Sequence, residues 1–397
     1  MSQLLNIVRS ALPDDAAGAS LAGRIWRPEL AGPSVIAVRD GVVLDISATF
    51  PTMRDLCEAA DPAAALRAAN GEAIGPVDAL LTNTPVETRD PGRPWLLAPL
   101  DLQAIKAAGV TFAISMLERV IEERARGDMQ AAGTIRAEVS RLVGDDLSKL
   151  KPGSPEAMRL KAVLIQQGAW SQYLEVGIGP DAEIFTKAQP MASVGTGMDA
   201  GIHPGSSWNN PEPEVVLAVS SLGRIVGATL GNDVNLRDVE GRSALLLGKA
   251  KDNNASCAIG PLLRLFDGGF GLDDVRSTTV TLRVDGPEGF ALEGASSIAK
   301  ISRDPEDLVA QMVNAHHRFP DGAVLFLGTM FAPIQDRDTP GQGFTHKYGD
   351  IVTVAAPKLG RLVNRMMPTD RCEAWSFGPG ALMRNLAGRG LLGQGTA

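Results

Sequence analysis

The chain has 397 residues, and its 44% hydrophobic and 21% charged residues are an ordinary mixture for a protein that buries a sizeable core. A formal net charge of −8, the lack of a basic stripe and an aromatic content of only 5% argue against a nucleic-acid partner. The cysteines form no Cys-x-x-Cys pair and no apolar run resembles a signal peptide or membrane span, so we expect a cytoplasmic protein without a membrane partner.

The first part of the chain predicts a small N-terminal α+β domain. Residues 23–46 alternate apolar and polar side chains around Asp40-Gly41, which predicts two strands joined by a tight turn. A short helix is expected over residues 53–69. A proline-rich exit over residues 91–99 marks the end of this domain, which we place at residues 1–95.

Residues 96–175 are predicted to form a helical segment that connects or covers the other parts. Apolar residues recur at helical spacing over residues 102–107 and 112–126. Charges of both signs alternate over residues 118–126, which is typical of a solvated helix face. Residues 129–170 are polar and amphipathic and predict two further helices.

From about residue 184 onward, short runs of Val, Ile and Leu recur between glycines. These runs are EVVLAVS, RIVGATL, TTVTLRV, AVLFLGT and DIVTVAA. Their spacing predicts a mixed or antiparallel sheet system rather than alternating strand–helix units. We therefore expect an α+β protein whose larger domain, residues 176–397, carries the chemistry.

Three carboxylates can converge in this domain. Glu212 and Glu214 lie two residues apart at the mouth of a predicted strand, so their side chains point to the same face. Asp233 follows the next apolar run, where a neighbouring strand can bring it alongside. Burying unpaired carboxylates is costly, and Mg²⁺ or Mn²⁺, which prefer hard oxygen ligands, would remove that cost. On spacing alone, the alternative is a solvent-facing glutamate pair and an aspartate in a turn.

The run from Glu183 to about Asn364 resembles the catalytic domain of the fumarylacetoacetate hydrolase superfamily. That family carries, in order, Glu-x-Glu, Asn-Asp-x-x-x-Arg-Asp, a lysine ahead of Gly-Pro, Gly-Thr and Gly-Asp-x-Val. The matching residues here are Glu212-Pro-Glu214, Asn232 to Asp238, Lys251 ahead of Gly260-Pro261, Gly328-Thr329 and Gly349-Asp350-Ile351-Val352. The resemblance implies a mixed β-sandwich roll with a smaller N-terminal domain, metal ligation by Glu212, Glu214 and Asp233, and a homodimer or homotetramer.

The hydrolases of this family activate water with a segment resembling Asn-Tyr-x-x-His-x-x-Glu. Residues 109–118 match that segment and retain Glu118, but Ser115 stands in place of the histidine. A serine cannot accept a proton at neutral pH without a base of its own. This departure argues against C–C bond hydrolysis and leaves Ser115 and Glu118 as predicted substrate-binding residues.

The dehydratases of the family that act on 2-keto-3-deoxypentonates are more similar to this chain. They share a glutamate before an Ile-Phe run, a Pro-Glu-Pro-Glu sequence and the site lysine, which correspond here to Glu183, Glu212 with Glu214, and Lys251. The resemblance implies that Glu183 and Lys251 form the acid–base pair, with the assignment of the two roles open. A lysine beside a metal is expected to have a depressed pKa. The alternative interpretation of Glu183 is a surface acid ahead of a strand.

Three further residues have two interpretations each. Lys187 matches a family position whose lysine lines the site, or it is an ordinary lysine at a strand edge. Thr329 presents a hydroxyl or amide to the substrate carboxylate, or it ends a strand in a simple turn. His346 contacts the distal hydroxyls of a sugar acid, or it lies exposed in a loop.

The sequence therefore predicts an Mg²⁺-dependent lyase, with Mn²⁺ as the other candidate ion. It would dehydrate a 2-keto-3-deoxypentonate to 2-ketoglutarate semialdehyde (2,5-dioxopentanoate) in sugar-acid catabolism. Two other reactions of a small 2-keto acid stay open, namely C–C hydrolysis of a 2,4-diketo acid and decarboxylation. A non-enzymatic alternative is a silent module that binds a metal or a 2-keto acid.

Overall fold

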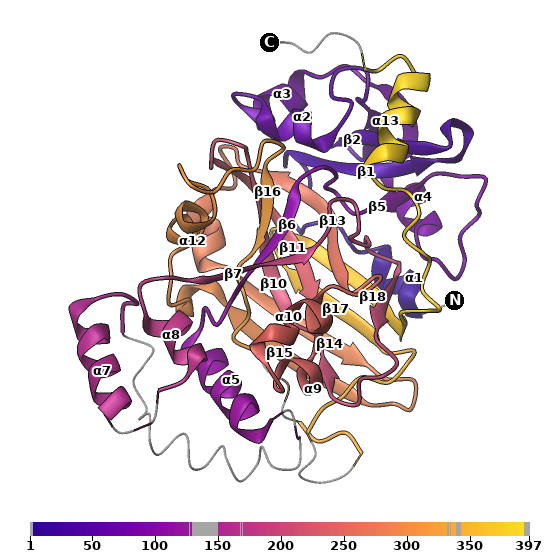
Figure 1. Cartoon of the computed structure of the whole chain (residues 1–397). Coiled ribbons are helices and arrows are strands. Elements are labelled where there is room, and N and C mark those ends of the chain that lie inside the picture. The colour runs from indigo at the N-terminus through magenta and orange to yellow at the C-terminus, as the bar shows by residue number, and fades with distance from the viewer. Residues whose placement is uncertain are drawn as a thin grey trace.

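The computed structural model describes residues 3–126, 128, 150–166, 168, 170–331, 333, 335–338 and 343–392. In this part of the chain, 11 strands form one mixed sheet (Figure 1). Its order is β4 (Glu72–Pro76), β3 (Val42–Asp45), β2 (Gly32–Arg39), β1 (Leu21–Arg27), β13 (Cys257–Leu265), β11 (Ile225–Asp233), β10 (Pro213–Val219), β16 (Ala323–Phe326), β6 (Ala104–Gly109) and β7 (Glu183–Ala188), and β5 (Trp95–Leu97) pairs with β1. Strands β16 and β6 are parallel, whereas the other neighbours are antiparallel.

A second sheet shares its core with the first. Its strands, in order, are β15 (Ala291–Ser297), β14 (Thr279–Asp285), β17 (Ile351–Ala356), β18 (Gly360–Pro368) and β8 (Asp199–Ile202). Leu217 and Leu230 of the large sheet lie in one buried cluster with Leu282 and Val354 of this second sheet. The predicted α+β class with mixed sheets is therefore confirmed.

The helices lie around these sheets. They are α1 (Gln3–Val8), α2 (Met53–Glu58), α3 (Pro62–Ala68), α4 (Val77–Asn83), α5 (Ala113–Ala125), α7 (Pro155–Gln166), α8 (Gln172–Ile178), α9 (Arg237–Glu240), α10 (Leu247–Lys251), α11 (Leu272–Ser277), α12 (Pro305–Met312) and α13 (Pro379–Gly388). In Figure 1, α5, α9 and α10 gather at one end of the molecule, whereas α2, α3 and α13 lie at the other. Within the described residues, no helix combines the length and hydrophobicity needed to cross a membrane.

The N-terminal predictions hold in part. The turn between β2 and β3 falls at Asp40-Gly41, where both residues have positive φ angles of 51° and 75°, as tight hairpins favour. The single helix predicted over residues 53–69 is wrong, because α2 and α3 are separate. Pro62 disfavours helical conformation at Asp61, whose side chain instead accepts from the Ala64 amide and begins α3.

The middle of the chain also departs from expectation. Residues 102–107, predicted as helix, contain strand β6, which pairs with both β16 and β7. A short apolar run that is largely buried in a sheet lacks the alternation that distinguishes strand from helix. Helix α5 is confirmed, and α7 lies within the predicted helical region 129–170, of which residues 129–149, 167 and 169 lie outside the described residues.

Strand pairing joins the predicted domains. Leu21 and Ala22 of β1 pair with Arg264 and Leu263 of β13, so the N-terminal strands continue the sheet that carries β10 and β11. The boundaries at residues 95 and 175 stay predictions, and the first of them falls within one continuous sheet.

A glycine keeps the centre of this sheet closely packed. Gly231 of β11 lies opposite Glu214 of β10, and an added Cβ would collide with the buried ring of Phe326 and with Val216. We expect Gly231→Ala to lower the free energy of unfolding by about 2 kcal/mol, because overpacking a tight core forces side chains off their rotamers. Urea denaturation measures this change.

The matched control is Gly268→Ala, because an added Cβ there meets no atom within 4 Å. Equal stabilities of the two variants would show that the β11 strand tolerates a side chain at position 231.

Candidate metal centre and active-site cavity

The pairing of β10 with β11 brings the three predicted carboxylates together. Glu212 immediately precedes β10, Glu214 lies within it, and Asp233 ends β11. The Asp233 amide donates to the Glu212 carbonyl at 3.0 Å, which keeps the two strand ends in register. One carboxylate oxygen from each of the three residues lies within 4.8 Å of the others, and all three side chains are buried. A solvent-facing glutamate pair is therefore excluded.

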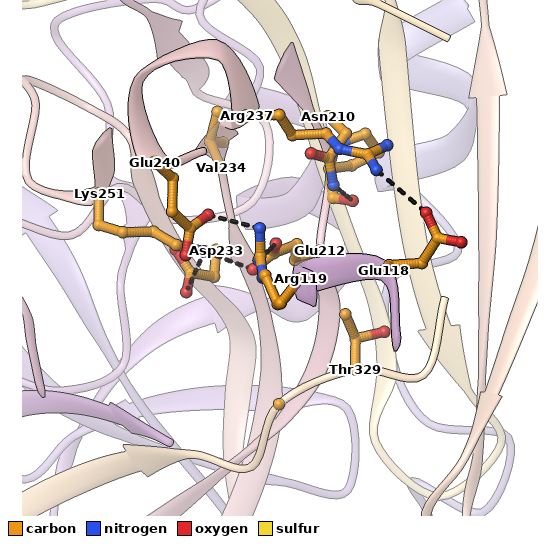
Figure 2. A network of polar contacts seen from close by, with 12 residues as sticks. Glu118, Arg119, Asn210, Glu212, Asp233, Val234, Arg237, Glu240, Lys251 and Thr329 are labelled. Carbon is orange, nitrogen blue, oxygen red and sulfur yellow. Dashed lines mark hydrogen bonds and ion pairs between the residues drawn. The ribbon is translucent and has the colours of Figure 1, made fainter. Parts of the chain in front are cut away.

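Cationic side chains surround this cluster (Figure 2). Lys251 Nζ lies 2.5 Å from Glu212 Oε2 and 3.1 Å from Asp233 Oδ2. On the other side of Glu212, Arg119 Nη2 donates to Oε1 at 2.7 Å. The Glu212 carboxylate is thus held between a lysine and an arginine.

Lys187 is fully buried on β7 rather than exposed at a strand edge. Its Nζ lies 2.8 Å from Asp233 Oδ1 and also donates to the carbonyls of Val234 and Lys251. It is not among the described residues that line the cavity. The structure therefore places Lys187 behind Asp233, where it orients that carboxylate, and direct contact with a substrate stays a prediction.

The carboxylates differ in how their charge is compensated. Burial opposes ionisation of Asp233, but Lys187 and Lys251 outweigh it and lower the pKa of this residue. Glu214 accepts instead from the Gly328 amide at 2.6 Å, and burial together with Asp233 and Glu212 raises its pKa well above the usual value. A cluster of three buried carboxylates, one of them poorly compensated, fits a hard divalent cation.

The carboxylates of the cluster determine the pKa of Lys251, and the depressed value expected beside a metal stays a prediction. Burial lowers it, but the carboxylates of Asp233 and Glu212 prevail and raise the pKa of Lys251 above its ordinary value. These carboxylate partners stabilise the protonated form of Lys251, which suits the role of proton donor.

A cavity opens in front of the carboxylates. Glu183, the first residue of β7, lies on its wall and faces Gly109 of β6, where any side chain would collide with the Glu183 carboxylate. Burial raises the pKa of Glu183 despite nearby Arg119 and Lys251. Glu183 is therefore a cavity residue and not a surface acid ahead of a strand.

Thr329 also lines the cavity, after the end of β16. Its hydroxyl accepts from the Phe331 amide at 3.1 Å. The preceding Gly328 has a left-handed φ of 83°, a conformation that favours glycine and directs its amide at Glu214. The strand-end turn thus forms part of the cavity wall, and the contact of Thr329 with a substrate carboxylate stays a prediction.

The predicted residues of α5 are only partly described. Glu118 lines the cavity, and its Oε2 accepts from Arg237 Nη2 at 3.4 Å. Ser115 lies in α5, but its side chain is outside the described residues. Its predicted substrate contact stays a prediction.

Several cavity residues were not predicted as site residues, among them Arg119, Glu240 and Asn210. Arg119 was included in the solvated helix face, which is wrong, since its side chain is 14% exposed and reaches Glu212. Its position beside the buried Met116 and Val120 was the available signal. Glu240 pairs with Arg119, and Asn210 has a buried Oδ1 without a hydrogen-bond partner in the described part of the chain. A polar group of this kind can accept a hydrogen bond from a bound hydroxyl.

His346 is buried, and its interpretation as an exposed loop residue is wrong. Its Nδ1 lies 2.9 Å from Asp350 Oδ2, and the Arg337 guanidinium donates to both oxygens of the same carboxylate. His346 is not among the described residues that line the cavity, so its predicted contact with substrate hydroxyls stays a prediction. The three side chains fasten the loop ahead of β17.

This network predicts a pH dependence of stability. Burial lowers the pKa of His346 below 6.5 despite Asp350, so the unfolded chain takes up this proton first as the pH falls. Stability from the neutral imidazole is present above the unfolded pKa and is lost below it. Between pH 7.5 and 5.5, we expect the wild type to lose more unfolding free energy than His346→Gln, by up to about 1.4 kcal/mol per pH unit. Parallel pH profiles of the two proteins would contradict this assignment.

The family model and the two curated relatives each match less than half of the chain. The family model described as fumarylacetoacetate (FAA) hydrolase C-terminal matches residues 214–367. The 2-dehydro-3-deoxy-D-arabinonate dehydratase of Saccharolobus solfataricus is 30% identical over 181 residues, or 46% of this chain and 57% of that relative. A probable 2-keto-3-deoxyxylonate dehydratase of Haloferax volcanii is 29% identical over 192 residues, which are 48% of this chain and 62% of that relative. The chain thus spans less than two thirds of either relative.

Solved structures extend the likeness to most of the chain. A 2-keto-3-deoxy-D-arabinonate dehydratase complexed with magnesium and 2,5-dioxopentanoate has a TM-score of 0.60 at 20% identity, covering 88% of this chain and 99% of that one. A fumarylacetoacetate hydrolase from Exiguobacterium antarcticum has a TM-score of 0.51 at 15% identity, with 88% and 100% covered. At these identities the likeness establishes a common fold.

Proposed function

Because the chain belongs to the fumarylacetoacetate hydrolase superfamily, and because its cavity joins a carboxylate cluster to Glu183 and Lys251, we propose that it is a metal-dependent dehydratase. Its substrate would be a 2-keto-3-deoxypentonate and its product 2,5-dioxopentanoate. The observation that carries the proposal is the placement of Glu183 and Lys251 on one cavity, beside the three carboxylates.

The cavity wall favours elimination over hydrolysis. None of the chain's four histidines is among the described residues that line it, so a histidine base for water activation is missing there. A buried carboxyl group of raised pKa and a protonated lysine are a base and an acid of the kinds that elimination requires. The two named dehydratase relatives support the same choice.

Glu212, Glu214 and Asp233 would hold the metal. When bound, a divalent cation would polarise the 2-keto group and stabilise the negative charge that develops on it. Mg²⁺ is the proposed ion and Mn²⁺ the alternative, since both prefer oxygen ligands.

The protein's own groups would move the protons. Glu183 would remove a proton from carbon 3, and Lys251 would donate a proton to the hydroxyl that leaves carbon 4 as water. The unsaturated product would then tautomerise to the semialdehyde. Asn210 and Thr329 would orient the polar groups of the substrate. A homodimer or homotetramer remains predicted.

The decisive assay mixes purified protein and Mg²⁺ with 2-keto-3-deoxypentonate, D and L separately, with and without EDTA. We expect one enantiomer to yield semialdehyde and EDTA to abolish its formation, because the metal supports the enolate charge. No semialdehyde from either enantiomer would contradict the proposal. Pyruvate release from a 2,4-diketo acid would then favour hydrolysis, and CO₂ release would favour decarboxylation. Tight binding of a 2-keto acid without turnover would favour a silent module.

Two variants separate the roles of Glu183 and Lys251. We expect Glu183→Gln and Lys251→Met each to lower kcat by about 10³-fold, as loss of a general acid or base does. In D₂O, Lys251→Met should still exchange the carbon-3 protons of pyruvate, whereas Glu183→Gln should not, because only Glu183 is assigned as base. NMR follows this exchange.

Calorimetric titration with Mg²⁺ is the control that both variants still bind the metal, since neither residue is proposed as a metal ligand. Exchange retained by Glu183→Gln and lost by Lys251→Met would reverse the two roles.

A further inference from the structure

Arg119 connects helix α5 to the proposed metal ligands. Its Nη2 donates to Glu212 Oε1 at 2.7 Å, and its Nη1 lies 2.6 Å from Glu240 Oε2 on α9 (Figure 2). The side chains of Glu212 and Glu240 are only 8% and 7% exposed. A guanidinium held between two buried carboxylates makes strong contacts, because little water screens them.

Both oxygens of Glu212 are therefore engaged by cations, since Lys251 lies 2.5 Å from Oε2. A divalent cation that binds Glu212 would meet one of these two charges at close range. Lys251 is also held by Asp233 at 3.1 Å, within the cluster itself. Arg119 instead reaches Glu212 from helix α5, and its second partner, Glu240, also lines the cavity. Arg119 is thus the cation that can release Glu212 and stay in the cavity.

We propose that Arg119 competes with the divalent cation for Glu212 and that, once displaced, it binds the carboxylate of the 2-keto acid. This inference rests on the proposed function. The planar guanidinium suits a carboxylate, to which it can donate two parallel hydrogen bonds. Metal binding would then make a positive charge available to the anionic substrate, because it releases Arg119 from Glu212.

Calorimetric titration with Mg²⁺ alone tests the first part. We expect Arg119→Met to bind Mg²⁺ about tenfold more tightly than the wild type, because a neighbouring positive charge is removed. Arg119→Lys, which keeps the charge, should remain near the wild type. Arg124→Met, at an exposed position of the same helix, is the matched control and should leave the affinity unchanged.

The double variant Arg119→Met/Glu240→Gln removes a second explanation, namely that the unpaired Glu240 attracts the metal. It should keep the gain in affinity over Glu240→Gln alone. Weaker or unchanged Mg²⁺ binding by Arg119→Met, in a protein with wild-type circular dichroism, would overturn the competition and leave Arg119 as a group that orients Glu212.

Titration with pyruvate at saturating Mg²⁺ tests the second part. We expect Arg119→Met to bind pyruvate about tenfold more weakly, while Arg124→Met binds it normally. Unchanged pyruvate affinity in Arg119→Met would overturn the carboxylate contact. Neither titration requires dehydration, so a failure of the proposed reaction with every sugar acid is distinguishable from a failure of this inference.

Discussion

The antiparallel pairing of β10 with β11 is the constraint on which the rest of the site depends. Every residue of β10 is buried, so Glu214 cannot turn to solvent without breaking the core that the two sheets share. The register then sets Asp233 beside Glu212. Three carboxylates held this closely repel one another, and burial magnifies the repulsion. The fold must therefore bring positive charge to this point, whatever reaction the cavity performs.

That charge arrives from three elements far apart in the sequence. Lys187 comes from β7, Lys251 from α10 and Arg119 from α5. The ion pairs that offset the repulsion therefore also hold together three elements that carry cavity residues. The compensation is uneven. Asp233 has two lysine partners and a lowered pKa, whereas Glu214 has a backbone amide and a raised one. Further positive charge is therefore needed on the Glu214 side of the cluster. A metal ion suits this position better than another side chain.

Sequence patterns predicted what depends on local spacing. The apolar runs marked the strands of the core, and the two-residue spacing of Glu212 and Glu214 predicted a common face. Patterns failed where a distant partner decides the outcome. Arg119 lies in a stretch of alternating charge, and only Glu212, 93 positions later, makes it a cavity residue. His346 lies in a loop, but its amide donates to Asn209, 137 positions earlier, and its side chain is buried. Strand β6 was missed for the same reason, because its neighbours β16 and β7 come from remote parts of the chain.

One metal platform can serve several reactions, so the groups opposite the carboxylates must select among them. Glu183 is fixed there by the pairing of β7 with β6, and the absence of a side chain at Gly109 allows its close approach. For the proposed elimination, a base at carbon 3 and an acid at carbon 4 must act on adjacent atoms of one bound molecule. Glu183 and Lys251 lie on elements that pack on each other, since α10 contacts β7. Their positions are set by the packing of these elements, so neither group loses conformational entropy when it is oriented for the reaction. This preorganisation lowers the free-energy barrier of the reaction.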